Sequence, residues 1–411
     1  MARILIIGTG FAGMWSALSA RRLINLRGKD QLIEVVVVAP RPSLVLRPRL
    51  YEPNAAGMTV PLQSLFQATG VRFVQGTVEA VHTSKHTVDL VSPSGNKSTM
   101  GYDRLILAAG SRIVQPAAIA GLAEHAFDVD GIDAAEKLES HLKQLATLPP
   151  SPARDTVVVC GAGFTGIEAA TELPGRLRSI FGGEATPKVV LVGNRGEVGP
   201  ELGPGPRPAI IEALTSTGVD VRLGAGVSAV DAQSVTLSNG ERIETLTPIW
   251  TAGVKATPLT QQIEGEKDAF GRLIVDADLR VPSCKDVFAT GDAAAALADN
   301  DGHLAMMSCQ HAIPLGKSSG NNAAADLLQE PTTPYTQPGY LTCLDLGGHG
   351  AVVTKGWDRE IMFTGSKAKY IKSQINQKLI YPPTTAEQAF AESKPGAFDP
   401  VPYAEQMAVS A

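Results

Sequence analysis

The chain has 411 residues, of which 44% are hydrophobic, 19% charged and 5% aromatic, and its formal net charge is -5. This composition predicts a globular protein with two domains and an appendage, and the few aromatic residues and the lack of a basic stripe argue against nucleic acid as a partner. No apolar run approaches the roughly 20 residues that span a bilayer, so we expect at most peripheral membrane contact. The four cysteines form no CxxC pair. We therefore expect a cytoplasmic protein with reduced thiols and no metal site.

The first predicted element is a short strand that leads into a glycine turn. Arg3–Ile7 is largely apolar, Gly8-Thr9-Gly10-Phe11-Ala12-Gly13 follows it, and Ala12–Arg22 has a helical pattern. In such a turn the first glycine permits the tight bend, the second lets a pyrophosphate approach the backbone, and the third lets the helix pack close to the strand. The free N–H groups at the helix start then favour a phosphate. The stretch therefore predicts a dinucleotide site.

The next strand, Ile33–Val38, is a continuous apolar run typical of a strand that is buried on both faces. It ends at Ala39-Pro40 without the acidic residue that commonly holds a ribose. The following loop, Arg41–Pro53, is stiffened by prolines and carries three arginines. Two interpretations remain open: a solvated connector, or a wall of the cofactor site with Arg47 or Arg49 near the pyrophosphate or an anionic substrate.

Three further stretches complete the first unit. Val71–Asp89 is predicted to form short strands that make a crossover layer on the sheet. Tyr102–Ser111 is predicted as another buried strand, and the small residues Ala108-Ala109-Gly110 at its end would let a cofactor lie close to the backbone. The proline-rich stretch Thr147–Asp155 is predicted as a hinge into a second unit.

The second unit repeats the glycine turn of the first. Val157–Cys160 is an apolar run, and Gly161-Ala162-Gly163-Phe164-Thr165-Gly166 follows it before a helical pattern. One such motif is weak evidence, but two predict two Rossmann-like units that bind two dinucleotides. The next strand, Lys188–Val192, leads to Gly193-Asn194-Arg195 without an acidic residue. Because an arginine here can accommodate a 2′-phosphate, this end favours NADPH over NADH.

The chain then returns to a parallel strand with a carboxylate at its end. Val287–Ala289 is followed by Thr290-Gly291-Asp292, and an aspartate at the carboxyl edge of a sheet is well placed to accept hydrogen bonds from sugar hydroxyls. Ser308–Leu328 is predicted as a helix. Because proline fits only the first turn of a helix, Pro314 predicts that regular helix begins near Ile313.

The C-terminal region differs in pattern from the two units. Tyr340–Leu346 and Ala351–Trp357 flank a glycine-rich turn and predict a β-hairpin, which is also a candidate for pairing two chains as a homodimer. Ala368–Gln377 predicts a short basic helix, and Leu379–Ala411 predicts a loosely packed, proline-marked tail. The lysines of this region, Lys367, Lys369 and Lys372, are predicted to form a solvated face, with substrate steering as the alternative.

The order of the motifs resembles a known family. GTGFAG, YDRLILAAGS, GAGFTGIEAATEL, WTAGVKATPL and VFATGD follow one another as in flavoprotein reductases with two dinucleotide domains. Within those, the chain is similar to the type II NADH:quinone oxidoreductases, also called alternative NADH dehydrogenases. The resemblance runs from Met1 to about Leu328. It implies an α/β fold in which an FAD domain, residues 1–120 and 257–335, is interrupted by an NAD(P)H domain, residues 121–256, and followed by a small α+β region, residues 336–411.

The resemblance also implies roles for individual residues. Asp292 matches the residue that binds the ribityl chain, Glu168 matches a glutamate beside the flavin and the nicotinamide, and Gln310 matches the first glutamine of a quinone-site motif. Pro48 and Tyr51 match a Pro-x-x-Tyr element over the flavin. The predicted catalytic residues are Glu168, Gln310 and His311, and the predicted cofactor-binding residues are Gly8, Gly10, Phe11, Ala12, Gly13, Pro40, Pro48, Arg49, Val78, Ala109, Gly110, Gly161, Gly163, Phe164, Thr165, Gly166, Arg195, Ala252, Gly253, Gly291, Asp292 and Ala312.

The implied activity is transfer of hydride from NADH or NADPH to FAD and then of two electrons to a quinone or another aromatic acceptor. Three features depart from the family: the second glutamine of the quinone motif falls on Pro314, Arg47 and Arg49 stand at usually apolar positions, and a hairpin replaces the membrane-binding C-terminal helices. Two alternatives therefore remain open. One is a reductase of an anionic aromatic acceptor, and the other is a redox-responsive flavin-binding protein with slow turnover.

The predicted catalytic side chains each have a structural alternative. Glu168, in the first turn of its helix, is either a partner of the nicotinamide and a proton relay or a carboxylate favoured by the helix dipole. Gln310 either contacts the substrate or is a structural residue that packs against its neighbours. His311 supplies a proton to a reduced quinone, given an ordinary pKa near 6.5, or is a hydrogen-bonded surface group. In either case, the backbone N–H groups beside His311 can stabilise the pyrimidine end of a flavin.

Overall fold

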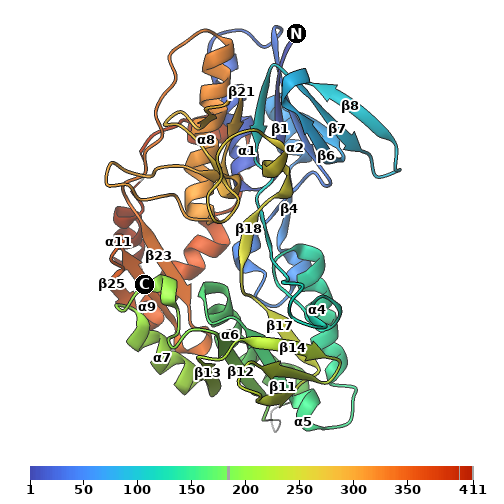
Figure 1. Ribbon diagram of the computed structural model, residues 1–411. Coiled ribbons are helices and arrows are strands. Elements are labelled where there is room, and N and C mark those ends of the chain that lie inside the picture. The colour runs from blue at the N-terminus through green and yellow to red at the C-terminus, as the bar shows by residue number, and fades with distance from the viewer. Residues whose placement is uncertain (183–185, 398, 410–411) are drawn as a thin grey trace.

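The structure is a computed structural model that describes residues 1–182, 186–397 and 399–409. Two α/β units lie end to end, and the C-terminal segment, drawn in red, runs along the side of both (Figure 1). Each unit is built around a parallel sheet. The predicted fold class, two Rossmann-like units and a small C-terminal α+β region, is confirmed.

The sheet of the first unit has six strands in the order β20-β21-β9-β1-β2-β5, all parallel except β20. One face of the sheet packs against helices and the other against an antiparallel layer, so alternate residues of each strand enter two different apolar clusters. Burial on both faces explains why the strands read as continuous apolar runs. The strands are β1 (Ala2–Ile7), β2 (Ile33–Ala39), β5 (Arg72–Gln75), β9 (Arg104–Leu107), β20 (Arg280–Val281) and β21 (Cys284–Ala289).

Two helices cover one face of this sheet, α1 (Phe11–Leu26) and α8 (Cys309–Leu327). They approach so closely that a Cβ placed on Gly320 would lie 2.1 Å from the carbonyl oxygen of Ser16. The hydroxyl groups of Ser16 and Ser319 are 3.0 Å apart between the same helices. The opposite face carries an antiparallel layer of β6 (Thr77–His82), β7 (Thr87–Val91) and β8 (Lys97–Gly101). The crossover layer predicted for Val71–Asp89 is therefore only partly right, because β5 of that stretch joins the main sheet beside β2 and β8 lies beyond it.

Helix α8 begins earlier than the sequence predicts. It starts at Cys309 with Ser308 as its N-cap, not at Ile313, so Pro314 lies inside the helix. A proline at that position leaves the carbonyl group four residues before it without its helical partner. That carbonyl belongs to Gln310, and the side-chain amide of Gln337 donates a hydrogen bond to it at 3.4 Å. The prediction failed because the replacement donor comes from a distant part of the chain.

The second unit repeats the two-faced arrangement with a four-stranded parallel sheet, in the order β13-β12-β11-β17. Helices pack on one face, and the antiparallel strands β14, β15 and β16 pack on the other. The elements are α4 (Ile132–Leu145), β11 (Thr156–Cys160), α6 (Phe164–Phe181), β12 (Lys188–Gly193), α7 (Arg207–Ser216), β13 (Val219–Leu223), β14 (Val227–Asp231), β15 (Ser234–Leu237), β16 (Arg242–Glu244) and β17 (Thr247–Trp250).

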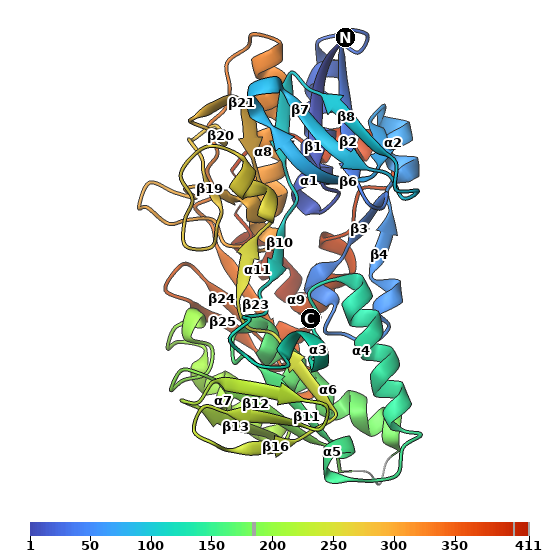
Figure 2. The same ribbon diagram turned by 45° about the vertical axis from the view of Figure 1, so that its right-hand side comes forward.

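The chain passes between the units twice, and the two passages pair with each other. Strand β10 (Ser111–Ile113) leaves the first unit, and β18 (Val254–Ala256) returns to it as its antiparallel partner. Figure 2 shows these strands between the two sheets. Shorter elements complete the units: β3 (Ser43–Val45), β4 (Thr59–Pro61), α2 (Gln63–Thr69), α3 (Leu122–His125), α5 (Pro152–Asp155), β19 (Leu273–Ile274) and β22 (Ala294–Ala295).

The C-terminal region contains the predicted hairpin, β23 (Leu341–Asp345) and β24 (Ala351–Lys355), and an additional strand, β25 (Glu360–Thr364). The predicted basic helix is α9 (Gly365–Gln374), which continues into a single π-helical turn.

The predicted loosely packed tail is wrong for the residues that the structure describes. It forms α10 (Ala386–Glu392) and α11 (Val401–Val409), in which Ala389, Ala404 and Ala408 are buried. Phe398, Ser410 and Ala411 of that tail lie outside the described residues. Within the described residues, no helix has both the length and the apolar character needed to cross a membrane.

Candidate functional site

The first glycine turn has the geometry that its sequence predicts. Gly8 has φ +112°, and a Cβ placed on it would lie 2.4 Å from the carbonyl oxygen of Ala108. A Cβ on Gly13 would lie 2.1 Å from the carbonyl oxygen of Gly8, so only glycine lets α1 start this close to β1. Gly10 is the N-cap of α1, and no atom lies within 4 Å of a Cβ placed on it. The start of α1 therefore has open space beside Gly10 and no side-chain cap.

Residues far apart in sequence meet beside this turn. A Cβ on Gly291 would lie 2.8 Å from the Cβ of Ala12 and 3.7 Å from that of Ala312, so three predicted cofactor-binding residues converge. Asp292 follows at once, and its Oδ2 accepts a hydrogen bond from the hydroxyl of Ser111 at 2.6 Å. This arrangement fits a flavin dinucleotide, because small residues clear the approach and a carboxylate stands at the strand end.

Of the two arginines of the proline-rich loop, Arg47 contacts Asp292 of this site and Arg49 contacts Glu52 and Tyr381, and both charges are paired. Arg47 Nη1 is 3.3 Å from Asp292 Oδ2, and its other terminal nitrogen pairs with Asp130. Arg49 pairs with Glu52 at 2.6 Å, and it donates a hydrogen bond to the hydroxyl of Tyr381. This geometry favours the interpretation of the loop as a wall over that of a solvated connector, and it leaves neither guanidinium free for an anionic acceptor.

The remaining predicted residues of the first unit occupy different environments. Gly110 has φ +66°, and its carbonyl accepts a hydrogen bond from the backbone of Thr257 at 2.9 Å. Phe11 and Val78 are buried, so their side chains contribute to the core. The carbonyl of Pro40 accepts a hydrogen bond from the side chain of Gln75, the last residue of β5.

The second glycine turn repeats the glycine spacing of the first turn, but its surroundings differ at one point. Gly161 has φ +135°, and a Cβ on Gly166 would lie only 1.7 Å from its carbonyl oxygen. Gly163 is the N-cap of α6, but a Cβ placed on it would meet the carboxylate of Glu201 at 2.8 Å. The backbone N–H of Phe164 donates to that same carboxylate at 2.7 Å. An acidic side chain of the chain itself thus lies at the predicted phosphate position.

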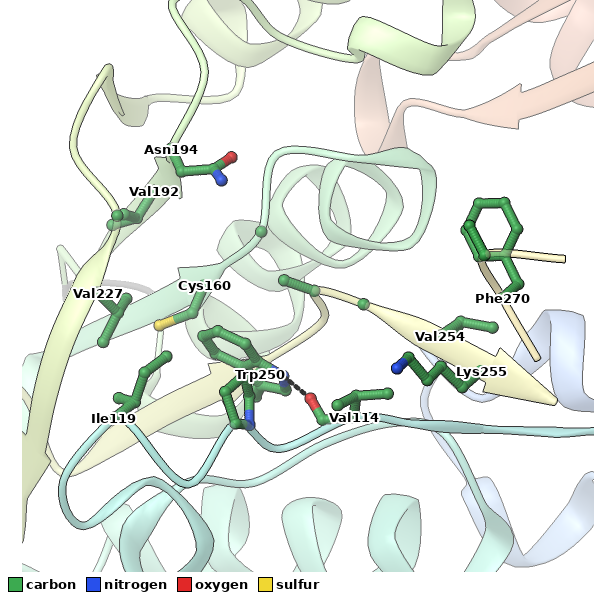
Figure 3. Close-up of a pocket in the computed structure, with 16 residues that line it drawn as sticks. Val114, Ile119, Cys160, Val192, Asn194, Val227, Trp250, Val254, Lys255 and Phe270 are labelled. Carbon is green, nitrogen blue, oxygen red and sulfur yellow. Dashed lines mark hydrogen bonds between the residues drawn. The ribbon is translucent and has the colours of Figure 1, made fainter. Parts of the chain in front are cut away.

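A cavity of about 490 Å³ opens beside this turn at the carboxyl edge of the second sheet. Its lining includes Gly161, Ala252 and Gly253, all predicted to bind the coenzyme, and Figure 3 shows Asn194 and Phe270 at opposite ends. Its floor is Trp250, whose indole N–H donates to the carbonyl of Val114 at 2.8 Å. Ligand pockets are typically 300–1,000 Å³ and mostly apolar, so this cavity is large enough for part of a dinucleotide.

The residues at the Asn194 end of the cavity bear on whether the coenzyme is NADH or NADPH. Arg195 is the next residue and is exposed, and the structure gives its side chain no ion pair among the described residues. Thr165, in the first turn of α6, is also exposed.

Glu168 is buried on α6 and faces a lysine from the C-terminal region. The prediction that it lies in the first turn is wrong, because α6 begins at Phe164 and has no acidic residue in its first turn. Glu168 Oε1 accepts hydrogen bonds from Lys372 Nζ at 2.7 Å and from the backbone N–H of Asp345 at 3.0 Å. Burial raises the pKa of Glu168 to about 7, although the ammonium of Lys372 opposes this effect. Burial alone would lower the pKa of Lys372, but the neighbouring Glu168 carboxylate raises it. The carboxylate is thus close to protonation at neutral pH, beside a fixed positive charge.

This ion pair belongs to a network that joins three parts of the chain. Asp345, on β23, accepts hydrogen bonds from the hydroxyl of Tyr51 at 3.0 Å and from Lys369 Nζ at 2.5 Å. Lys372 also donates to the carbonyl of Cys343. The prediction of a solvated lysine face is therefore wrong for Lys372, which is 7% exposed as a side chain, and incomplete for Lys369, which is 38% exposed.

A sequence signal for the buried lysine existed. Lys372 stands one residue after Ile371 and four after Ala368, both of them buried, so it lies in the apolar stripe of α9 at helical spacing. A lysine in such a stripe needs a buried partner. The sequence offers no comparable signal for Glu201, which lies in a loop rich in glycine and proline.

The other two predicted catalytic residues have structural contacts. The side-chain amide of Gln310 bonds both the carbonyl and the N–H of Leu341, at 3.0 and 3.2 Å, and so fixes the free edge of β23. His311 is fully buried, so the expectation of a surface group is wrong. Burial, followed by the charges of Arg359 and Arg272, lowers the pKa of His311 to about 4. The imidazole is therefore neutral at pH 7, which disfavours the predicted supply of a proton from a cationic His311.

Comparison with known proteins extends these observations. The family model described as pyridine nucleotide-disulphide oxidoreductase matches residues 2–316. An NADH dehydrogenase-like protein of Mycobacterium tuberculosis is 44% identical over 392 residues, which cover 95% of this chain and 96% of that protein. A type II NADH:quinone oxidoreductase of Staphylococcus epidermidis is 24% identical over 398 residues, which cover 92% and 95%. The solved structure of NDH2 from Plasmodium falciparum in complex with NADH has a TM-score of 0.73 at 16% identity, covers 95% of this chain and 96% of that chain, and supports the fold.

Proposed function

This chain belongs to the pyridine nucleotide-disulphide oxidoreductase family, and we propose that it takes hydride from NAD(P)H onto a bound FAD and passes two electrons to a quinone. It is an oxidoreductase that binds FAD and a nicotinamide coenzyme. The observation that carries the proposal is the duplicated glycine turn, at which the starts of two helices, α1 and α6, would each offer backbone N–H groups to a phosphate.

In this proposal the first turn holds the pyrophosphate of FAD. The clearance around Gly10 and the meeting of Ala12, Gly291 and Ala312 allow a flat cofactor to lie against the backbone. Asp292 would accept hydrogen bonds from the ribityl hydroxyls of a bound FAD, and Arg47 fixes the orientation of its carboxylate. FAD supplies the chemistry, because it accepts a hydride and returns two electrons to a second substrate. The side chains around it align the reactants and exclude water.

Glu168 is the residue that we propose acts beside the reacting rings. Its carboxylate would accept a hydrogen bond from the carboxamide of a bound nicotinamide, and in its protonated form it would supply the proton that completes the quinol. Its buried position beside Lys372, together with a pKa near neutrality, suits that exchange. Lys372 positions the carboxylate and balances its charge. Asp345 and Lys369 continue the network towards solvent, where Lys369 is partly exposed.

The support for a quinone as the acceptor comes from relatives of lower sequence identity. Relatives of this chain include type II NADH:quinone oxidoreductases, at 24% identity in the example above. The alternative of an anionic acceptor loses its main support, because Arg47 and Arg49 are both ion-paired within the chain. We also propose that NADPH is preferred over NADH, since the end of β12 carries Arg195 and no acidic residue. The four unpaired cysteines suit a reducing cytoplasmic setting.

A two-stage anaerobic experiment tests this function. The purified flavoprotein is first mixed with NADH or NADPH, and flavin bleaching is followed at increasing coenzyme concentration. We expect full bleaching with both coenzymes and tighter saturation with NADPH. A panel of short-tailed quinones, anionic quinones and dyes is then added, and the return of colour is timed. Bleaching without reoxidation by any quinone would contradict the proposed acceptor, and a long-lived long-wavelength band with slow turnover would favour a redox-responsive binding protein.

Glu168→Gln separates the role of the carboxylate from that of the fold. We expect this variant to keep its flavin but to pass electrons to quinone about 10²–10⁴-fold more slowly, because the proton that completes the quinol would have lost its donor. The matched control is Glu172→Gln, one turn later on α6. Equal rates in the wild-type protein and in Glu168→Gln would remove Glu168 from the mechanism.

A further inference from the structure

Glu201 occupies a position that the glycine turn predicts for the coenzyme. It lies in the 3₁₀ turn Pro200–Leu202, and its carboxylate accepts a hydrogen bond from the backbone N–H of Phe164 at 2.7 Å. Phe164 is the first residue of α6, so this N–H belongs to the helix start that attracts anions. The same carboxylate oxygen would be 2.8 Å from a Cβ on Gly163, the residue whose missing side chain admits the pyrophosphate.

The local sequence explains why this carboxylate comes to rest there. Helix α6 has no capping side chain of its own, because its N-cap is Gly163, and it has no acidic residue in its first turn. A helix start without a cap attracts any acceptor within reach. The loop that carries Glu201 is anchored on both sides by the buried residues Val198 and Leu202. The glutamate side chain itself is exposed, so it can rotate away while the anchors stay in place.

We propose that Glu201 is an internal competitor of the coenzyme: in the ligand-free protein it caps α6, and the pyrophosphate of NAD(P)H displaces it. The proposal rests on the proposed function for the identity of the ligand. Phe164 offers a single N–H, which cannot serve the carboxylate and the pyrophosphate fully at once. Two anions at one helix start also repel each other. The carboxylate therefore has to leave, and breaking its contacts subtracts from the affinity for the coenzyme.

A competitor and a simple helix cap differ in one measurable effect, which is how removal of Glu201 changes the affinity for the coenzyme. Loss of a cap lowers the stability of the ligand-free protein whether or not the cap competes with a ligand. Only a competitor makes binding tighter when it is removed, because the bound state no longer has to break the interaction. A residue that helps to hold the coenzyme would have the opposite effect on binding.

The test measures binding of NADPH and of ADP-ribose to the FAD-loaded protein by titration calorimetry. ADP-ribose carries the pyrophosphate but cannot reduce a flavin, so its binding is independent of turnover. For Glu201→Ala and Glu201→Gln we expect Kd values about 2- to 5-fold lower for both ligands, the size of an exposed charge at a helix start. The gain should shrink as salt rises, and the ligand-free thermal midpoint of Glu201→Ala should fall.

Glu197→Gln is the matched control, because it removes the same charge from the same loop. Glu197 pairs with Arg207 at 3.0 Å, and among the described residues no hydrogen bond joins it to α6, so the Kd values of this variant should equal those of the wild-type protein. Unchanged or higher Kd values in both Glu201 variants would overturn the proposal. If the wild-type protein bound neither NADPH nor ADP-ribose, the proposed function itself would be wrong, which is a distinct result.

Discussion

The two glycine turns of this protein have nearly the same sequence but different surroundings. In both, the first glycine has a positive φ and the last one lets a helix start against its strand. The middle glycines differ: no atom lies within 4 Å of a Cβ on Gly10, whereas a Cβ on Gly163 meets Glu201. The helix that follows the second turn also carries Glu168, which forms a buried ion pair with the C-terminal region.

This difference suits the roles that we propose for the two sites. A cofactor that stays bound through many turnovers needs a cradle without an internal competitor. A coenzyme that enters and leaves in every cycle tolerates a competitor, because exchange matters more than the tightest binding. An acidic side chain of the chain itself bonds the start of α6, whereas the start of α1 has no side-chain cap. Substitutions at the two turns and at their ion pairs would break that asymmetry in different ways.

Lys372→Met is expected to lower the free energy of unfolding at pH 7 by about 3–5 kcal/mol, because it leaves Glu168 buried without a partner. Urea denaturation followed by circular dichroism measures the loss. Lys369→Met is the control: its ammonium is partly exposed, and about 1 kcal/mol or less is expected. The double variant Lys372→Met with Glu168→Gln should recover part of the loss. A Lys372→Met protein as stable as the wild type would show that the fold around α6 does not depend on the ion pair between Lys372 and Glu168.

Gly13→Ala and Gly166→Ala are expected to destabilise by about 2–3 kcal/mol, because each new Cβ would overlap a backbone carbonyl oxygen. Their cofactor losses should differ. Gly13→Ala should purify without flavin colour, whereas Gly166→Ala should keep its flavin and lose coenzyme binding. Absorbance spectra and coenzyme titrations measure these outcomes. Gly175→Ala is the control, because nothing lies within 4 Å of its Cβ and helix propensity favours alanine there. Loss of flavin from Gly166→Ala would contradict the assignment of the two turns.

These local motifs could be read from the sequence because each turn is specified by its own residues. The glycine spacing at Gly8 and Gly161 sets strand, turn and helix within a few residues, and both units were predicted. The start of α8 was not, because a side chain at Gln337 replaces the hydrogen bond that Pro314 removes. The partner of Glu168 lies 204 residues away and was also missed. Pairings between distant segments leave only faint local signals, such as a lysine in an apolar stripe.

The pH dependence of stability tests the start of α8, which lies beside the first turn. His311 is buried, and its pKa is lowered from 6.5 to about 4. The unfolded chain therefore binds a proton between these values while the folded chain does not, so stability falls as pH decreases from 6.5 to 4. This group alone should account for a loss of about 2 kcal/mol between pH 7 and pH 5. His311→Asn should flatten that part of the urea-derived stability curve, and an unchanged slope would contradict a neutral buried imidazole.

The smallest effects bear most directly on the difference between the two turns. Gly10 and Gly163 both have negative φ values that alanine adopts without strain. Gly10→Ala should therefore leave the flavin-free protein within about 0.5 kcal/mol of the wild type, while the new methyl group displaces the pyrophosphate and abolishes flavin retention. Gly163→Ala should lower the stability of the ligand-free protein by about 0.3–1 kcal/mol, because the methyl group pushes the Glu201 carboxylate off the start of α6.

A double variant shows whether that second loss comes from Glu201. In a Glu201→Ala background the carboxylate is already absent, so Gly163→Ala should have no further effect on the ligand-free protein. Thermal denaturation of the four proteins in this cycle, each loaded with FAD and free of coenzyme, gives the coupling. A full additive loss in the double variant would mean that the methyl group disturbs the turn itself. In that case the contact between Glu201 and α6 would be incidental, and the two turns would differ only in sequence.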